Sequence, residues 1–193
     1  MHDLTGGCVV LRGKKTQDAM MDYTWRSNPL LARVDAVSPL NMSFSEYLVI
    51  HKDQLKFPPP NTRRFAVCTS NDHHIGNVMC YDIDYIHREA EIGIIIGDTS
   101  YWGHGYGFSA MVLMVDYIFS KIPLKKLYLH TLHWNGRARK CFQRCGFGDV
   151  RLVNRDGMKF IRMELLKTHW KDIRDEKFVD LESARNIASL QVD

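Results

Sequence analysis

The spacing of apolar side chains predicts two helices in the first third of the chain. In residues 43–57 the apolar positions fit one face of a helix, and Ser43 and Glu46 form a capping box, in which each side chain satisfies a backbone N–H group at the helix start. Residues 16–28 are predicted as a shorter helix. It ends at Asn28, because a residue that precedes proline avoids helical geometry.

Segments rich in β-branched and aromatic residues predict a sheet. After a β-like run at residues 8–12, strands are expected at 63–70, 74–86 and 91–96, and the short polar turns between the last three predict an antiparallel meander. Residues 94–96 are three consecutive isoleucines. The strand that carries them is therefore expected to be buried on both faces, in the middle of the sheet.

Helices and strands alternate in the second half of the chain. A helix that is apolar nearly all round is expected over 107–121, followed by a strand at 124–132. A basic helix at 136–145 is ended by Gly146 as its C-cap glycine. A turn at 154–157 joins the last two strands.

These elements predict an α/β (α+β) fold in one domain, with a mixed, mostly antiparallel central sheet of about seven strands flanked by helices. The domain is expected to cover residues 1–172, and residues 173–193 are expected to form an appended helix or a loosely held tail. A homodimer through the sheet edge or this tail stays open.

A glycine-rich stretch, YWGHGYGFSA (101–110), lies between the strand expected at 91–96 and the start of the next helix. The backbone N–H groups of such a loop and of the first helical turn point one way, and with the positive end of the helix dipole they form a site for phosphate. Glycines keep side chains away from that backbone and allow positive φ. The spacing is neither the G-x-G-x-x-G of a dinucleotide-binding turn nor a P-loop, so taken alone it also fits a tight turn without a ligand.

Composition and charge constrain the function only partly. The chain has 193 residues, of which 45% are hydrophobic, and this suits one globular domain with a substantial core. The net charge of +4 is weak evidence for nucleic-acid binding. Residues 137–174 hold 11 Lys or Arg against 4 Asp or Glu, an excess that fits either an anionic ligand or a solvated basic surface.

The cysteines and histidines give no sign of a disulfide framework or a metal site. Five cysteines without a CxxC pair are expected to be reduced thiols in a cytoplasmic protein. The nine histidines show no metal-ligand spacing, so no metal is expected. The start lacks a signal pattern, and no apolar run approaches the roughly 20 residues of a membrane span, so no membrane partner is expected.

The order of these motifs resembles the GNAT superfamily of acetyl-CoA-dependent N-acetyltransferases, in particular the branch of ribosomal-protein N-terminal and polyamine acetyltransferases. The strand EIGIII, the loop WGHGYG, a helix, a strand and the segment NGRARKCFQRCGF follow one another at the family's distances. In the family's loop pattern Gln/Arg-x-x-Gly-x-Gly/Ala, Trp102 stands at the Gln/Arg place, and Gly105 and Gly107 match the glycines.

The resemblance implies that acetyl-CoA is the co-substrate. Its pyrophosphate is expected on backbone N–H groups of about 103–108, and its pantetheine arm along the exposed edge of a splayed pair of strands. The expected cofactor-binding residues are Ile94, Ile95, Ile96, Trp102, Gly103, His104, Gly105, Tyr106, Gly107, Phe108, Asn135 and Arg139. Asn135 also suits a helix N-cap, which is compatible with contact to the pantetheine arm. Arg139 or Lys140 is expected to meet phosphates.

The catalytic residues are less fully indicated. Glu91 starts the central strand near the place where the family often keeps a carboxylate, and it is the expected general base, acting through water. The alternative for Glu91 is a solvated carboxylate at a strand end. Phe142 stands where many relatives carry a tyrosine that protonates the leaving thiolate, and phenylalanine cannot donate that proton.

The leading hypothesis is therefore an acetyl-CoA-dependent N-acetyltransferase that transfers the acetyl group directly to a primary amine. Candidate acceptors are a protein N-terminus, a polyamine, an amino sugar or a small amine metabolite. Phe142 motivates a second hypothesis, a catalytically silent CoA-binding module. A third, a basic protein associated with the ribosome or with nucleic acid, depends on the charge of residues 137–174 alone.

Overall fold

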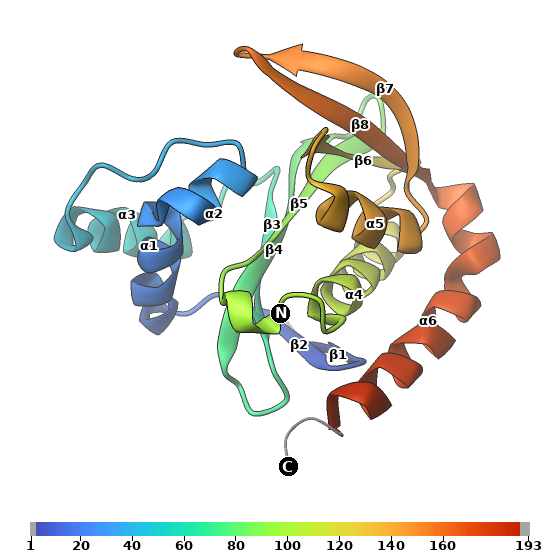
Figure 1. Cartoon of the computed structure of the whole chain (residues 1–193), viewed down its shortest axis with the longest axis horizontal. Helices are drawn as coiled ribbons and strands as arrows, with labels where there is room; N and C mark the ends of the chain where they lie inside the picture. The colour runs from blue at the N-terminus through green and yellow to red at the C-terminus, as the bar shows by residue number, and fades with distance from the viewer. Residues whose placement is uncertain (1–2, 190–193) are drawn as a thin grey trace.

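A computed structural model describes residues 3–189 as one twisted sheet with helices on both faces. Figure 1 shows α1, α2 and α3 on one side of the sheet and α4, α5 and α6 on the other. The predicted mixed α/β fold is confirmed. The helices are α1 (Ala19–Ser27), α2 (Pro29–Val34), α3 (Phe44–Lys56), α4 (Tyr106–Lys121), α5 (Gly136–Arg144) and α6 (Lys167–Ser189).

The described sheet has eight strands in the order β1-β2-β3-β4-β5-β6-β8-β7, and every neighbouring pair is antiparallel except β5 and β6. The predicted meander is confirmed as β3-β4-β5. The strand added to the predicted seven is β1, a short edge strand. The strands are β1 (Leu4–Gly6), β2 (Val9–Gly13), β3 (Arg63–Cys68), β4 (His74–Asp84), β5 (Glu89–Ile96), β6 (Lys126–Leu132), β7 (Gly148–Arg155) and β8 (Met158–Leu166).

Two details differ from the predicted elements. The segment 16–28 is divided into a 3-10 turn at Thr16–Asp18 and the helix α1. The unpredicted helix α2 follows at once, because the Asn28 side chain accepts hydrogen bonds from the N–H groups of Leu30 and Leu31 and Pro29 occupies the first helical position. The same Asn-Pro pair therefore ends one helix and starts the next.

The three isoleucines of β5 are not buried on both faces as predicted. The strand is central in the sheet, and its residues Ala90–Ile92 are buried, but residues 94–96 are only partly buried. The difference arises because β5 loses its partner β6 at this end and borders an open cleft. Consecutive apolar residues identified a central strand but could not show that one edge of it stays uncovered.

The main hydrophobic core lies between the sheet and α4, whose side chains are buried nearly all round, as predicted. Helix α6 runs without a break across the expected boundary at 172/173. Its Trp170 is buried and donates from Nε1 to Asp116 of α4 (3.2 Å), while Leu181 lies against β1 at Gly6. None of the described helices is both long enough and apolar enough to cross a membrane.

A buried ion pair joins β2 to the segment that leads into α1. Arg12 donates from Nη2 and Nη1 to the two oxygens of Asp18 (2.8 and 3.0 Å), and the Lys15 backbone N–H donates to the same carboxylate (2.7 Å). Burial alone would raise the pKa of Asp18, but these hydrogen bonds outweigh it and hold the pKa at about 2. The charged form of Asp18 is therefore favoured by folding.

We expect the substitution Asp18→Asn to lower the free energy of unfolding by about 3 kcal/mol at pH 6, because it leaves a buried guanidinium without its main partner. A folded-state pKa below the ordinary value of 3.8 gives stability that is present above pH 4 and is lost as the pH falls toward 2. The difference in free energy of unfolding between the parent and the Asp18→Asn variant should therefore shrink by about 1 kcal/mol between pH 6 and pH 3.

Urea unfolding at the two pH values measures this difference. Asp72→Asn is the matched control, because Asp72 also pairs with Arg12 but is exposed. A variant at position 18 that is as stable as the parent at pH 6 would contradict the assignment.

Candidate functional site

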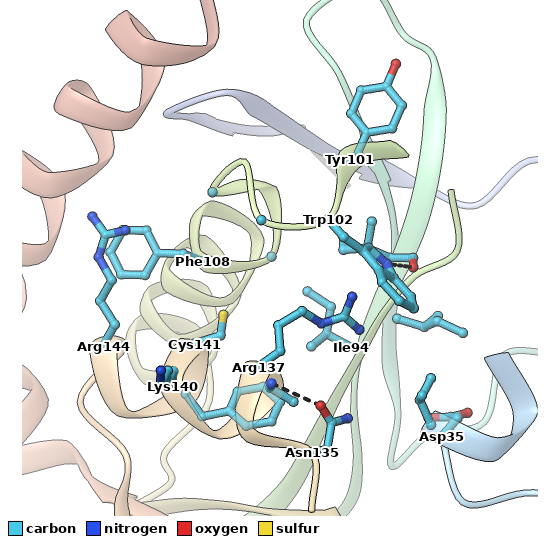
Figure 2. A pocket seen from close by; sticks show the side chains of 18 residues that line it. Asp35, Ile94, Tyr101, Trp102, Phe108, Asn135, Arg137, Lys140, Cys141 and Arg144 are labelled. Carbon is cyan, nitrogen blue, oxygen red and sulfur yellow. Dashed lines mark hydrogen bonds between the residues drawn. The ribbon is translucent and has the colours of Figure 1, made fainter. Parts of the chain in front are cut away.

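The central feature of the site is a gap in the sheet between β5 and β6. The two strands pair only at residues 89–91 and 126–128, and beyond these pairs they separate. The predicted splayed strand pair is thus present. A cleft of about 310 Å³ opens between the end of β5, the β5–α4 loop and α5 (Figure 2). This size is sufficient for part of an extended ligand.

The loop at the mouth of the cleft adopts a conformation that requires glycine. Gly103 and Gly105 have φ values of +82° and +86°, in the left-handed region, and Gly105 is the N-cap residue of α4. Gly107 lies in the first turn of α4 with Cys141 close by, since an added Cβ would lie 3.7 Å from the Cys141 Sγ. The unpaired N–H groups of the first helical turn border the cleft and can hold an anion there.

Trp102 is fixed on the β5 side of the cleft. Its indole N–H donates to the backbone oxygen of Ile96 (2.7 Å from Nε1 to O), which ties the loop to the end of β5. The Arg137 guanidinium lies over the indole ring, with its Cζ 3.2 Å from the ring centroid. Figure 2 shows Arg137 extending from α5 toward Trp102 across the cleft.

Helix α5 supplies the opposite wall. Asn135 is its N-cap, because the side-chain oxygen accepts from the Ala138 N–H (3.2 Å), and Asn135 also lines the cleft. The prediction that Arg139 binds the cofactor is not supported, since Arg139 turns away and pairs with Asp149. The basic residues that do line the cleft from α5 are Arg137, Lys140 and Arg144.

The helical period explains why Arg137 lines the cleft and Arg139 does not. Positions 137, 140, 141 and 144 share one face of a helix, whereas position 139 lies about 200° round the axis from position 137.

Most of the other expected cofactor-binding residues line the cleft: Ile94, Ile95, Ile96, Trp102, Gly103, Gly105, Gly107, Phe108 and Asn135. His104 and Tyr106 do not line it. His104 is exposed, and Tyr106 packs edge-on against Tyr101.

A second cavity, also of about 310 Å³, continues from the cleft on the other side of the splay and contains Glu91. The alternative of a solvated carboxylate is wrong for Glu91, which is 8% exposed. The His130 ring lies 2.8 Å from it (Nδ1 to Oε1), and Arg155 lies 3.1 Å from the other ring nitrogen of His130. Arginine can only donate, so Nε2 accepts from Arg155 and Nδ1–H donates to Glu91.

No local pattern in the sequence indicates this chain of hydrogen bonds. Glu91, His130 and Arg155 lie on different strands, and only the sheet order brings them together. Tyr81 and Asp35 line the same cavity, and burial together with the charge of Glu91 raises the pKa of Tyr81. The cavity thus combines a buried carboxylate with hydrogen-bond donors that orient it, an arrangement suited to proton transfer.

Cys141 is the thiol nearest to the cleft. A hydrogen bond from Cys145 and the charges of Arg144 and Arg137 lower the pKa of Cys141, while burial raises that of Cys145. The Cys141 side chain lines the cleft and is only partly buried. Within residues 3–189, no three His, Cys, Asp or Glu side chains are grouped so as to hold a metal ion.

In the described sheet the one parallel strand pair separates, and a glycine-rich turn and a helix N-terminus lie at the gap. This arrangement is typical of a class of acyltransferases. The chain belongs to the GNAT family: its residues 9–148 match the model of the acetyltransferase (GNAT) domain. The expected family and fold are thereby confirmed.

Two curated relatives are spermidine acetyltransferases. Spermidine N(1)-acetyltransferase of Vibrio cholerae is 38% identical over 85 residues, which cover 44% of this chain and 49% of that protein. The enzyme of that name from Escherichia coli K12 is 36% identical over 85 residues, 44% of this chain and 45% of that protein. The matched stretch thus spans about half the length of these curated relatives.

Solved structures extend the similarity over most of the fold. The crystal structure of spermidine N-acetyltransferase from Vibrio cholerae in complex with CoA and spermine superposes with a TM-score of 0.75 at 26% identity. The superposition covers 84% of this chain and 98% of that one.

Proposed function

We propose that the protein is an N-acetyltransferase that transfers the acetyl group of acetyl-CoA directly to a primary amine. The observation that carries the proposal is the meeting of the two cavities, which share Ile94, Asn135, Ala138 and Phe142 in their walls. A thioester that enters from the glycine loop ends at this junction. An amine that enters from the other side meets it next to Glu91.

The residues of the cleft fit coenzyme A. Positive-φ glycines at the start of α4 keep side chains off the backbone N–H groups, and three basic side chains of α5 line the same cleft. When bound, acetyl-CoA supplies the activated acetyl group as a thioester. The β5 backbone beyond Glu91 has no partner on β6, so its N–H groups on that edge are free to stabilise an oxyanion.

Glu91 is the base that removes the proton from the acceptor amine, directly or through one water. His130 donates to Glu91 through Nδ1–H and keeps the carboxylate aimed into the cavity. Arg155 in turn fixes the tautomer of His130, so that the ring cannot accept a proton on Nε2 without losing this contact. The acetyl group passes to the amine without a covalent acetyl-enzyme.

The acceptor class is supported by the relatives, which are spermidine acetyltransferases by name. A polyamine is therefore the first acceptor to test, and a protein N-terminus, an amino sugar and a small amine metabolite are the others. The assay measures release of CoA thiol from acetyl-CoA with each amine. We expect release that depends on the acceptor, and binding of CoA in calorimetry. Failure to bind CoA would overturn the proposal.

A second candidate function is CoA binding without turnover, which Phe142 favours. This side chain is buried at the junction of the two cavities, at the family's tyrosine position, and has no hydroxyl to protonate the thiolate. This candidate predicts tight CoA binding without acceptor-dependent thiol release.

We expect Phe142→Tyr to raise kcat by about 10-fold or more, because general-acid assistance contributes roughly 10²–10⁴-fold when it is fully positioned. Steady-state thiol release measures the change. Phe142→Leu is the control that keeps an apolar side chain, and it should not raise kcat. An unchanged kcat in the tyrosine variant would show that another group already protonates the thiolate.

A further inference from the structure

The loop that borders the cleft contains no strong cation of its own. Residues 97–107 include neither lysine nor arginine, and their titratable side chains other than tyrosine are Asp98 and His104. A diphosphate held by backbone N–H groups carries charge that these amides cannot neutralise. A cation that reaches the loop from another element would balance this charge.

Arg137 is the side chain placed to do this. It lies at the second position of α5, and its guanidinium is 3.2 Å from the centroid of the Trp102 ring. Trp102 cannot move freely, because its indole N–H is bonded to the Ile96 backbone oxygen. A guanidinium that stacks on a fixed aromatic face keeps its charge and leaves the N–H donors at its rim available.

Arg137 carries a charge that no carboxylate of the described chain neutralises. In the described part of the chain no carboxylate forms an ion pair with Arg137, whereas Arg139 is paired with Asp149 and Arg144 lies 3.9 Å from Asp180. Arg137 has no hydrogen-bond acceptor among the described residues either. Its side chain lines the cleft beside the glycine loop.

We infer that Trp102 and Arg137 together form a phosphate clamp, in which Trp102 holds the Arg137 guanidinium over the glycine loop and Arg137 donates to the diphosphate of coenzyme A. The inference depends on the proposed function, since it assigns this ligand to the cleft. Guanidinium N–H groups pair with phosphate oxygens in a bidentate way, and such charge-assisted bonds are stronger than neutral ones. The loop supplies the backbone contacts, and α5 supplies the positive charge.

The test compares coenzyme A with pantetheine, which lacks every phosphate, by calorimetry on the full chain. We expect R137Q to weaken CoA binding about 10- to 100-fold, because it removes a charge-assisted contact. The affinity of R137Q for pantetheine should stay within about twofold of the parent's, since the proposed site of the pantetheine arm lies along β5. R139Q is the matched control on the same helix, and it should leave CoA binding within twofold because Arg139 faces Asp149.

A double-mutant cycle tests the role of Trp102. W102L should weaken CoA binding in the parent chain but have no further effect in the R137Q background, because Trp102 acts through Arg137. An equal effect of W102L in both backgrounds would overturn the clamp. A loss of CoA affinity below threefold in R137Q would also overturn the clamp, and so would a loss of pantetheine affinity equal to the loss of CoA affinity. A parent chain that fails to bind CoA at all would instead overturn the proposed function.

Discussion

Substitution of Gly105 by glutamate is expected to abolish binding of coenzyme A. Gly105 has a φ of +86°, which costs a residue with a side chain about 1–2 kcal/mol. As the N-cap residue of α4, it also lies beside the backbone N–H groups proposed to hold the diphosphate. A carboxylate at this position would occupy or repel the anion. Both effects act in the same direction, and we expect the Kd to rise more than 100-fold.

Calorimetry with CoA measures the change, and far-UV circular dichroism confirms that the variant is folded. Gly148→Glu is a suitable control, because Gly148 starts β7, has no atom near its added Cβ and does not line the cleft. That control should bind CoA as the parent does. A Gly105→Glu protein that is folded and binds CoA within threefold of the parent would show that the loop is only a tight turn.

The substitution Glu91→Gln should reduce kcat by roughly 10²–10⁴-fold, the usual contribution of a positioned general base. Glutamine keeps the size of the side chain and can still accept a hydrogen bond from His130, so the cavity should be preserved. Glu91 does not line the cofactor cleft. The Kd for CoA should therefore stay unchanged while turnover falls.

Single-turnover and steady-state rates with saturating acetyl-CoA separate these two quantities. The control is Glu89→Gln on the same strand, because Glu89 is partly exposed and paired with Lys126 (2.7 Å) outside both cavities. A loss of less than threefold in the Glu91 variant would exclude Glu91 as the base. In that event Asp35, which lies at both cavities, becomes the carboxylate to test.

The parts of the site that depend on local backbone chemistry could be predicted from the sequence. Glycines spaced between a strand and a helix predict a turn with positive φ and an open backbone, and Gly103 and Gly105 do adopt positive φ. Asn135 suited a helix N-cap by residue type alone and proved to be one. Antiparallel neighbours joined by short turns also follow from local patterns, so the β3-β4-β5 meander was predictable.

The parts that depend on side-chain direction or on contacts between distant segments were not predictable in this way. Arg137 and Arg139 are equally basic, and only the rotation of α5 decides which one faces the cleft. The pairing of Glu91 with His130 requires knowing that β5 and β6 are neighbours and in which register. The basic excess over residues 137–174 fits an anionic ligand and a solvated surface equally well, and three of these basic residues line the cleft from α5.

The narrow junction between β5 and β6 has a mechanical consequence. Only three residue pairs join the part of the sheet from β1 to β5 to the part from β6 to β8. Helix α6 follows directly from β8 in one part and reaches β1 in the other, where Leu181 contacts Gly6. The C-terminal helix thus ties the two parts of the sheet together from outside, at a place that does not line the cleft.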